Sequence, residues 1–257
     1  MRPVCALSFG HFRAPSVPGP GLAMPASLIM SPYEKAWQAM QQRIARAADA
    51  ADRDPAAIRL LAVSKGMAAE AIRALYAFGQ RAFGENYVQE ASAKMTALAD
   101  LPDIEWHLIG PLQRNKARAA AARFAWVQTI DGPAIAERLS ATREAGQGPL
   151  DVCVQVNISA ETSKSGIAPA GALALARAVG SLPRLALRGF MGIAAPEAEA
   201  TRQRAQFRLL REILAAAQAE GLMLDTLSMG MSGDLEAAIA EGATMIRVGS
   251  ALFGPRA

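Results

Sequence analysis

Short apolar runs alternate with alanine-rich helical stretches along most of this chain, and that alternation constrains the fold more than any other feature. From Ser31 onward, the apolar runs recur at intervals of roughly 20 to 35 residues. They predict eight strands, over residues 58–65, 81–85, 104–110, 125–131, 151–159, 187–194, 226–230 and 245–251. The stretches between them predict seven helices, over residues 68–78, 87–98, 112–122, 133–145, 168–181, 197–219 and 234–241. One more amphipathic helix, capped by Ser31 and with Pro32 in its first turn, precedes the first strand.

Strands that alternate with helices indicate a parallel sheet joined by right-handed crossovers, and two α/β folds meet this description. In a doubly wound open sheet, ligand-binding residues gather at one switch point of the strand order. In this chain polar residues follow nearly every predicted strand, which favours the other fold, a single (β/α)8 TIM barrel. Residues 31–257 contain eight strand–helix units, and about 250 residues are typical of such barrels.

Residues 1–30 differ in composition from the rest of the chain. They hold five prolines and three glycines, and the first acidic residue of the sequence is Glu34. Because this segment contains no uninterrupted apolar core, it makes a poor signal peptide. We therefore expect residues 1–30 to form a disordered leader that precedes the barrel domain. A translation start at Met24 or Met30 would account for the same composition.

Composition and charge exclude several classes of function. The net charge is +4, but the basic residues are spread along the chain and aromatic residues make up only 5%, so no surface for single-stranded nucleic acid is expected. No apolar run approaches the ~20 residues of a membrane-spanning helix. The two cysteines, Cys5 and Cys153, argue against a disulfide framework and favour a cytoplasmic protein. The only histidines are His11 and His107, which leaves little scope for a histidine-rich metal site.

Polar residues interrupt the apolar runs near their C-terminal ends, which is where barrels place their functional groups. These interruptions are Lys65, the stretch 84–86, His107, Asn157, the stretch 161–166 and Arg247. Lys65 is unusual because the chain has only five lysines against 22 arginines, and this one follows a strand that is expected to be buried. The alternative explanation for Lys65 is a strand-end lysine that reaches solvent.

Two turns that contain glycine and serine follow the last two predicted strands. The first is SMGMSGD at residues 228–234, and the second is RVGSALFG at residues 247–254. Backbone N–H groups at such turns bind phosphate, because the following helix N-terminus is electropositive and glycine lets the backbone approach closely. The loops after strands seven and eight are the recurrent phosphate site of barrels, so we infer a phosphorylated ligand. Taken singly, Ser232 would be only an N-cap and Gly249 only a turn.

Lys65 and Arg247 both lie on strand faces that can point into the barrel. Lys65 shares strand parity with Leu61 and Val63, and Arg247 shares it with Gly249. A lysine that is desolvated beside another cation loses its proton more easily, and its free amine attacks carbonyl groups. A phosphorylated aldehyde would satisfy the lysine, the arginine and the phosphate loops together, and pyridoxal phosphate is the commonest such molecule. A sugar phosphate bound as in class-I aldolases would use the lysine and the loops, but it would give the arginine no pyridine ring to contact.

Seven motifs, in order along the chain, resemble those of the pyridoxal phosphate (PLP) homeostasis protein family, the YggS/PROSC group. The motifs are LLAVSK, FGENYVQE, WHLIGPLQRNK, VNISAETSKSGI, GFMGIA, LSMGMSGDLEAAI and MIRVGSALFG. The resemblance covers about residues 31–256 and includes nearly every predicted strand end. It implies a fold similar to the N-terminal barrel domain of alanine racemase, without that enzyme's C-terminal β-domain. It also implies that PLP is held as a Schiff base, the internal aldimine.

The resemblance further implies roles for individual residues. Lys65 matches the family's Schiff-base lysine, Arg247 matches the arginine that faces the pyridine nitrogen, and Asn86 matches an asparagine on the cofactor side. The segments that match the family's phosphate loops supply six residues, Ser228, Gly230, Met231, Ser232, Gly249 and Ser250.

Three more residues are predicted to lie at the cofactor. Met191 is where a residue of strand six would pack near the ring, and His107 approaches the same region from strand three. Lys164, in TSKSG, matches a second lysine at the mouth, a place where cofactor waits or leaves. Family members often carry a further lysine soon after the Schiff-base lysine, but the text here is SKGMAAEA, so a relay between two lysines of this loop is not expected.

The family implies a carrier that buffers and delivers PLP, and we expect a cytoplasmic monomer of this kind without strong catalytic activity. Its expected partners are PLP and PLP-dependent apoenzymes. The alternative is a PLP-dependent amino-acid racemase, which needs acid/base groups on both faces of its substrate. Tyr87 is the one candidate to oppose Lys65, and the chain ends at Ala257, so a racemase-type second domain is not expected. An arginine at the pyridine nitrogen keeps that nitrogen unprotonated and weakens PLP as an electron sink.

Overall fold

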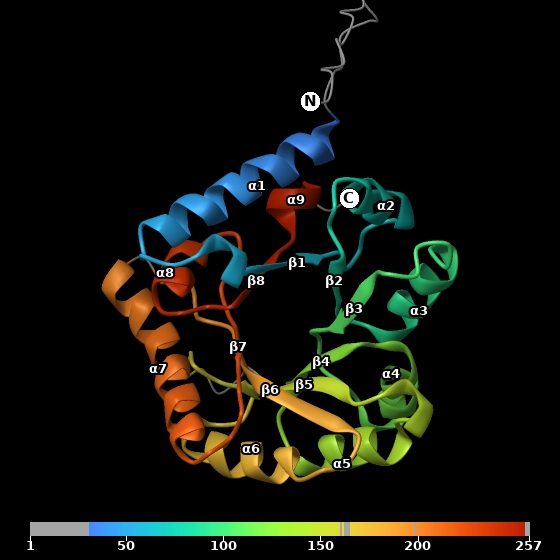
Figure 1. Cartoon of the computed structure of the whole chain (residues 1–257), viewed down its shortest axis with the longest axis vertical. Helices are drawn as coiled ribbons and strands as arrows, with labels where there is room; N and C mark the ends of the chain where they lie inside the picture. The colour runs from blue at the N-terminus through green and yellow to red at the C-terminus, as the bar shows by residue number, and fades with distance from the viewer. Residues whose placement is uncertain (1–30, 160, 162–164, 198, 255–257) are drawn as a thin grey trace, which may run out of the picture. The chain divides into compact units, whose positions relative to one another are not determined.

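The computed structural model describes residues 31–254 except 160, 162–164 and 198, so the 1–30 leader and Lys164 lie outside the described residues. Within that range, eight parallel strands close into a barrel with helices around it (Figure 1). The strands are β1 (Arg59–Val63), β2 (Ala82–Glu85), β3 (Glu105–Leu108), β4 (Trp126–Ile130), β5 (Leu150–Val156), β6 (Leu185–Gly192), β7 (Thr226–Ser228) and β8 (Met245–Val248). Each strand pairs with the next one along the chain, and β8 pairs with β1. The predicted TIM barrel is therefore confirmed, and so are all eight predicted strands.

Helices follow the strands in the predicted order. They are α1 (Pro32–Asp49), α2 (Ala69–Ala77), α3 (Val88–Ala97), α4 (Ala117–Arg123), α5 (Pro133–Thr142), α6 (Ala172–Gly180), α7 (Ala200–Ala219), α8 (Leu235–Ala240) and α9 (Ser250–Phe253). Short 3-10 turns add η1 (Pro55–Ala57), η2 (Arg114–Lys116), η3 (Ala145–Gln147) and η4 (Pro169–Gly171). The predicted strand 245–251 is shorter than expected, because β8 ends at Val248 and α9 begins at Ser250. No helix in the described part of the chain is long and apolar enough to cross a membrane.

The first helix begins where the sequence predicts. The Ser31 hydroxyl accepts a hydrogen bond from the Glu34 backbone N–H at 3.1 Å, and Pro32 occupies the first helical position. The buried face of α1 includes Met40 and Ile44, and the helix packs against α8 and α9. It therefore lies on the outside of the barrel next to the last two strand–helix units.

The two faces of the strands bury different sets of side chains. Outward-facing residues form one large core with the helices, whereas two small apolar clusters fill the inside of the barrel. The inner clusters are Leu61, Ala82 and Met245, and Trp126, Cys153 and Met191. Because Lys65 has the parity of Leu61 and Arg247 has the parity of Met245, both cations belong to the inner face. Their position near the C-terminal ends of β1 and β8 brings them to the mouth of the barrel.

Candidate functional site

A cavity of about 270 Å³ opens at the C-terminal ends of the strands. It is lined by residues at or just after the ends of β1, β2, β3, β6 and β8 and by the loop that follows β7. These are Val63, Lys65, Asn86, Ile109, Ile193, Met231, Ser232, Gly233, Arg247, Gly249 and Ser250. Seven of the site residues predicted from the sequence therefore line one cavity.

Lys65 occupies a tight turn directly after β1. The Met67 backbone N–H closes this turn by donating to the Ser64 carbonyl at 2.9 Å. Gly66 has a φ of +73°, a left-handed conformation that glycine adopts without strain and that a type II turn requires at this position. The glycine after the lysine thus ends the strand sharply and leaves the half-buried Lys65 side chain at the cavity.

A buried ionic cluster behind this turn holds both neighbours of the cavity lysine. The Lys94 ammonium group, on α3, donates to the Ser64 carbonyl, to Glu85 Oε1 and to Glu90 Oε1, each at 2.7 Å. The same Glu90 oxygen accepts the backbone N–H of Gly66 at 2.6 Å. Residues 64 and 66 are therefore anchored to the outside of the barrel, which fixes the backbone from which the cavity lysine projects.

Arg247 places a buried cation at the floor of the cavity. Only 4% of its surface is exposed, and burial lowers its pKa to about 10 against the opposing effect of the Asp234 carboxylate. Its Nη1 donates to the hydroxyl oxygen of Ser228 at 2.8 Å, and its Nη2 donates to the Gly192 carbonyl at 2.8 Å. Both of these partners are neutral, so the guanidinium adds positive charge to the site.

The two predicted phosphate loops meet on the same wall. Met231, Ser232 and Gly233 come from the loop between β7 and α8, and Gly249 and Ser250 come from the junction of β8 and α9. The first loop is shaped by the carboxylate of the next residue, Asp234, which accepts the backbone N–H of residue 231 at 2.5 Å. Backbone N–H groups, hydroxyls and a nearby guanidinium thus occur together, as anion binding requires.

Asn86 follows β2 and reaches the cavity beside a close backbone contact. A Cβ atom built on Gly110 would lie 2.3 Å from the Asn86 carbonyl oxygen and 2.6 Å from its Cα. Only glycine permits such an approach, because the atoms in the way belong to backbone and cannot rotate aside. The backbone segments 84–86 and 108–111 therefore pack against each other at this glycine.

Gly110→Ala is expected to destabilise the protein by about 1–3 kcal/mol and to weaken ligand binding, because the added methyl group must displace residue 86 from the cavity. Thermal unfolding and a ligand titration measure the two effects. The matched control is Gly132→Ala, since a Cβ on Gly132 would meet nothing within 4 Å. Equal melting temperatures for the two variants would contradict the steric argument.

Two predicted cofactor contacts, His107 and Met191, lie deeper in the barrel than predicted. Met191 is fully buried and packs with Trp126 and Cys153. His107 is also fully buried, and its ring stacks on Trp126 with 5.2 Å between centroids. Neither residue lines the cavity, because each lies one layer below it.

The predicted phosphate contacts Ser228 and Gly230 also lie beneath the cavity wall. The Ser228 hydroxyl is fully buried and is already bonded on both sides, to Arg247 and to Gln128. Gly230 has a φ of +92°, and a Cβ there would lie 2.6 Å from the Ala238 side chain, so this glycine lets the loop pack on α8. Neither residue is among those that line the cavity, and their direct contact with phosphate stays a prediction.

Two apolar lining residues, Ile109 and Ile193, were not predicted from the sequence. Ile109 comes two positions after His107, and Ile193 comes two positions after Met191. A step of two residues keeps the side chain on the inner face and moves it one layer toward the mouth. Strand parity therefore predicted correctly which side chains point into the barrel, but it did not predict how far each side chain lies from the mouth. Tyr87, the predicted second acid/base candidate, is 62% exposed and is not among the lining residues.

Comparison with known proteins agrees with this architecture. A family model described as "Alanine racemase, N-terminal domain" matches residues 36–257. A relative from Pseudomonas aeruginosa, named pyridoxal phosphate homeostasis protein, is 58% identical over 214 residues, which is 83% of this chain and 91% of the relative. The chain belongs to the pyridoxal phosphate homeostasis protein family.

Solved structures place this family among related barrels. PipY of Synechococcus elongatus, solved with PLP bound, is 43% identical and superposes with a TM-score of 0.72 over 82% of this chain and 100% of PipY. An alanine racemase from Clostridium difficile shares the barrel fold, with a TM-score of 0.65 at 13% identity. That match covers 84% of this chain but only 56% of the racemase, so part of the racemase lies outside the shared barrel fold.

Proposed function

We propose that this protein binds PLP in the barrel cavity, and that it buffers and delivers the cofactor without strong catalytic activity of its own. One observation carries the proposal: Lys65, Arg247 and the glycine- and serine-containing loops after β7 and β8 all face one cavity. The names of the relatives and the PLP bound to PipY support the same ligand. Delivery to PLP-dependent apoenzymes, a cytoplasmic location and a monomeric state are parts of the same proposal.

The donor set of the cavity fits the chemistry of PLP. The ligand offers a phosphate dianion, an aldehyde and a pyridine nitrogen, and it supplies an electrophilic carbon that condenses with an amine to a Schiff base and water. The loop N–H groups and the hydroxyls of Ser232 and Ser250 are suited to the phosphate. The Lys65 amine is suited to the aldehyde, and the buried Arg247 has N–H groups beyond the two that are already bonded. Asn86 also lines the cavity, and its side chain can donate or accept a hydrogen bond.

The positive charge of Arg247 bears on the choice between carrier and enzyme. A guanidinium donates and does not accept, so it favours an unprotonated pyridine nitrogen and a weak electron sink. Among the described residues that line the cavity, Lys65 is the one with an amine, and none is a tyrosine. These two features favour a carrier. The fold shared with alanine racemase supports the second candidate, a PLP-dependent racemase, at the level of architecture alone.

The carrier proposal is tested by transfer of PLP. The purified protein is saturated with PLP, desalted and mixed with the apo form of a PLP-dependent enzyme, and the activity of that enzyme is followed. Recovery of enzyme activity together with loss of the carrier's visible absorbance supports delivery. A protein that takes up PLP but never activates the apoenzyme would be a PLP-binding protein without the proposed delivery role.

We expect the PLP-loaded protein to cause no exchange of the α-hydrogen of alanine or serine in deuterated water beyond the rate with free PLP. The physical reason is that proton removal and return on two faces need two acid/base groups, and the described cavity wall offers one lysine. Proton NMR of the amino acid follows the exchange directly. Exchange that rises in proportion to protein concentration would overturn the carrier proposal in favour of the racemase.

A further inference from the structure

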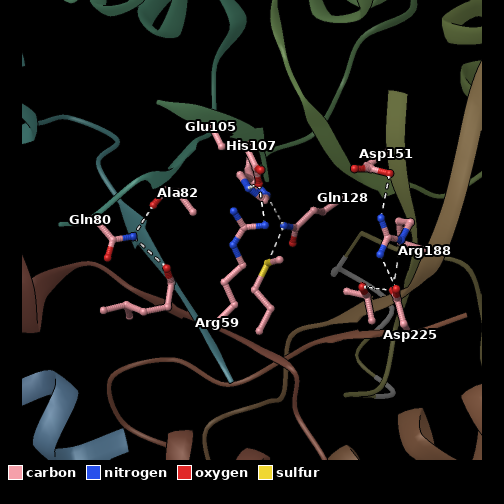
Figure 2. Close-up of polar contacts among 12 residues, drawn as sticks. Arg59, Gln80, Ala82, Glu105, His107, Gln128, Asp151, Arg188 and Asp225 are labelled. Carbon is pink, nitrogen blue, oxygen red and sulfur yellow. Dashed lines mark hydrogen bonds and ion pairs between the residues drawn. The ribbon is translucent and has the colours of Figure 1, made fainter. Parts of the chain in front are cut away.

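A continuous series of hydrogen bonds runs through the inside of the barrel from the cavity floor to its opposite end. Arg247 donates to Ser228 at 2.8 Å, and the Ser228 hydroxyl lies 2.6 Å from Gln128 Oε1. Gln128 Nε2 lies 2.9 Å from His107 Nδ1, and His107 Nε2 lies 2.5 Å from Glu105 Oε1. At the far end, Arg59 forms an ion pair with that same Glu105 oxygen at 2.8 Å (Figure 2).

The chemistry of the groups fixes the direction of every bond in this series. An arginine can only donate, so Ser228 accepts from Arg247 and turns its own proton toward Gln128 Oε1. The Gln128 amide then presents Nε2–H to His107, whose Nδ1 must carry no proton in order to accept it. The remaining ring proton therefore sits on Nε2 and is donated to the Glu105 carboxylate, which only accepts.

The surroundings of His107 favour this neutral form. The ring is fully buried and stacks on Trp126, and burial lowers its pKa in spite of the adjacent Glu105 carboxylate. Burial also acts to raise the pKa of Glu105, but hydrogen bonds from His107 and Arg59 outweigh it and lower that pKa to about 2. The series therefore ends on a carboxylate that stays ionised at neutral pH.

We propose that Gln128 and His107 are positioning residues for the cofactor site, which orient Arg247 through Ser228 from an anchor at Glu105. A serine hydroxyl rotates freely unless both of its bonds are fixed, so Ser228 holds the guanidinium only while Gln128 takes its proton. Gln128 Nε2 donates to His107 Nδ1 at 2.9 Å and to Met245 Sδ at 3.1 Å, and because a thioether sulfur is a weak acceptor, His107 contributes most to the orientation of the amide. This inference rests on the proposed function in one respect, namely that Arg247 faces the pyridine nitrogen of PLP.

A second polar cluster of the barrel, which is partly exposed, serves as a comparison. Arg188 lies between Asp151 and Asp225, with its Nη1 at 3.4 Å from Asp151 Oδ1, in the same close-up (Figure 2). Among the described residues, none of its hydrogen bonds leads to Arg247. Asp151→Asn therefore perturbs a half-buried polar group of the barrel whose hydrogen bonds do not join the proposed series.

The test compares the wild type, Gln128→Met and Asp151→Asn. For each protein, dissociation constants are measured for PLP and for an analogue in which carbon replaces the pyridine nitrogen. Gln128→Met keeps the length of the side chain but can neither accept from Ser228 nor donate to His107. We expect it to bind PLP about tenfold more weakly, which is the effect of one lost hydrogen bond, and to bind the carbon analogue with unchanged affinity. Asp151→Asn is expected to bind both ligands like the wild type. Unchanged PLP affinity in Gln128→Met, or equal weakening for both ligands, would overturn the proposal.

Nitrogen-15 NMR of His107 tests the series without any ligand, so it also separates this proposal from the proposed function. We expect a protonated Nε2 and an unprotonated Nδ1 in the wild type. In Gln128→Glu, a carboxylate faces Nδ1, and both ring nitrogens are expected to be protonated at neutral pH. A wild-type ring with its proton on Nδ1 refutes the hydrogen-bond direction, whereas a wild type with this NMR signature that binds no PLP counts against the proposed function.

Discussion

Lys65→Ala is expected to abolish the visible absorbance that the wild type develops on addition of PLP. The Schiff base needs a primary amine that can lose its proton, and Lys65 is the described residue at the cavity that supplies one. The turn around it is held by Gly66 and Lys94, so alanine removes the amine without removing the support of the backbone. The loss of the band should therefore be complete.

Two measurements make this first prediction specific. Borohydride reduction followed by peptide mass mapping should place the cofactor on Lys65 in the wild type and find no labelled peptide in the variant. Lys35→Ala, which removes an exposed lysine of α1, is the matched control and should keep the full band. A Lys65→Ala protein that remains yellow, or a label on another lysine, would refute the assignment. A wild type that never develops colour would return attention to a sugar phosphate as the ligand.

Lys94→Met is expected to lower the free energy of unfolding by about 3–5 kcal/mol at neutral pH, because it leaves a buried carboxylate without its cation. Glu85 is completely buried, and Lys94 itself is nearly so. Burial raises the pKa of Glu85, while the hydrogen bonds from Lys94 and Ser64 act in the opposite direction. Glu85 Oε2 has no hydrogen-bond partner in the described part of the chain, so Oε1 accepts all the bonds that stabilise this charge.

The pH dependence of this loss has a definite sign. Without Lys94 the pKa of Glu85 in the folded protein rises further above its unfolded value, so the folded state binds more protons than the unfolded state between the two values. The stability of the variant therefore falls as pH rises above about 4.5, and its deficit against the wild type is smallest in acid. Urea unfolding of both proteins at several pH values measures this difference in the free energy of unfolding.

A second substitution separates the charge from the packing. Glu85→Gln added to Lys94→Met removes the unpaired buried carboxylate and is expected to restore much of the lost stability. The double variant should also lose the pH dependence described above. If Lys94→Met is equally destabilised at pH 5 and pH 8, or if Glu85→Gln restores nothing, the contribution of Lys94 is packing of its alkyl chain and not charge compensation.

The same cluster connects stability to the proposed site. Lys94 and Glu90 hold the carbonyl of Ser64 and the N–H of Gly66, which flank the cavity lysine on both sides. This cluster was not predicted from the sequence. Its signal was present, because Lys94 has Glu90 four residues before it in the same helix, but that spacing alone predicts an exposed helical pair.

The sequence alone determined the architecture and the inner face of the strands. Apolar runs that alternate with helical stretches allow few folds, and side chains of one parity on neighbouring strands must share a face, so Lys65 and Arg247 could be placed together at the barrel mouth. The turns after β7 and β8 were also predictable, because glycine and serine occur in both of the loops that form the recurrent phosphate site of barrels.

Only the tertiary structure decided how deep each inward residue lies and what it contacts. The strands of a barrel are tilted and staggered, so residues at equal distances from their strand ends occupy different layers. For this reason Arg247 lines the cavity, whereas His107 and Met191, which are equally one residue before the ends of their strands, lie beneath it. The bonds from Arg247 to Glu105 join four different strands, and no local pattern in the sequence records which polar side chains meet across the axis of a closed barrel.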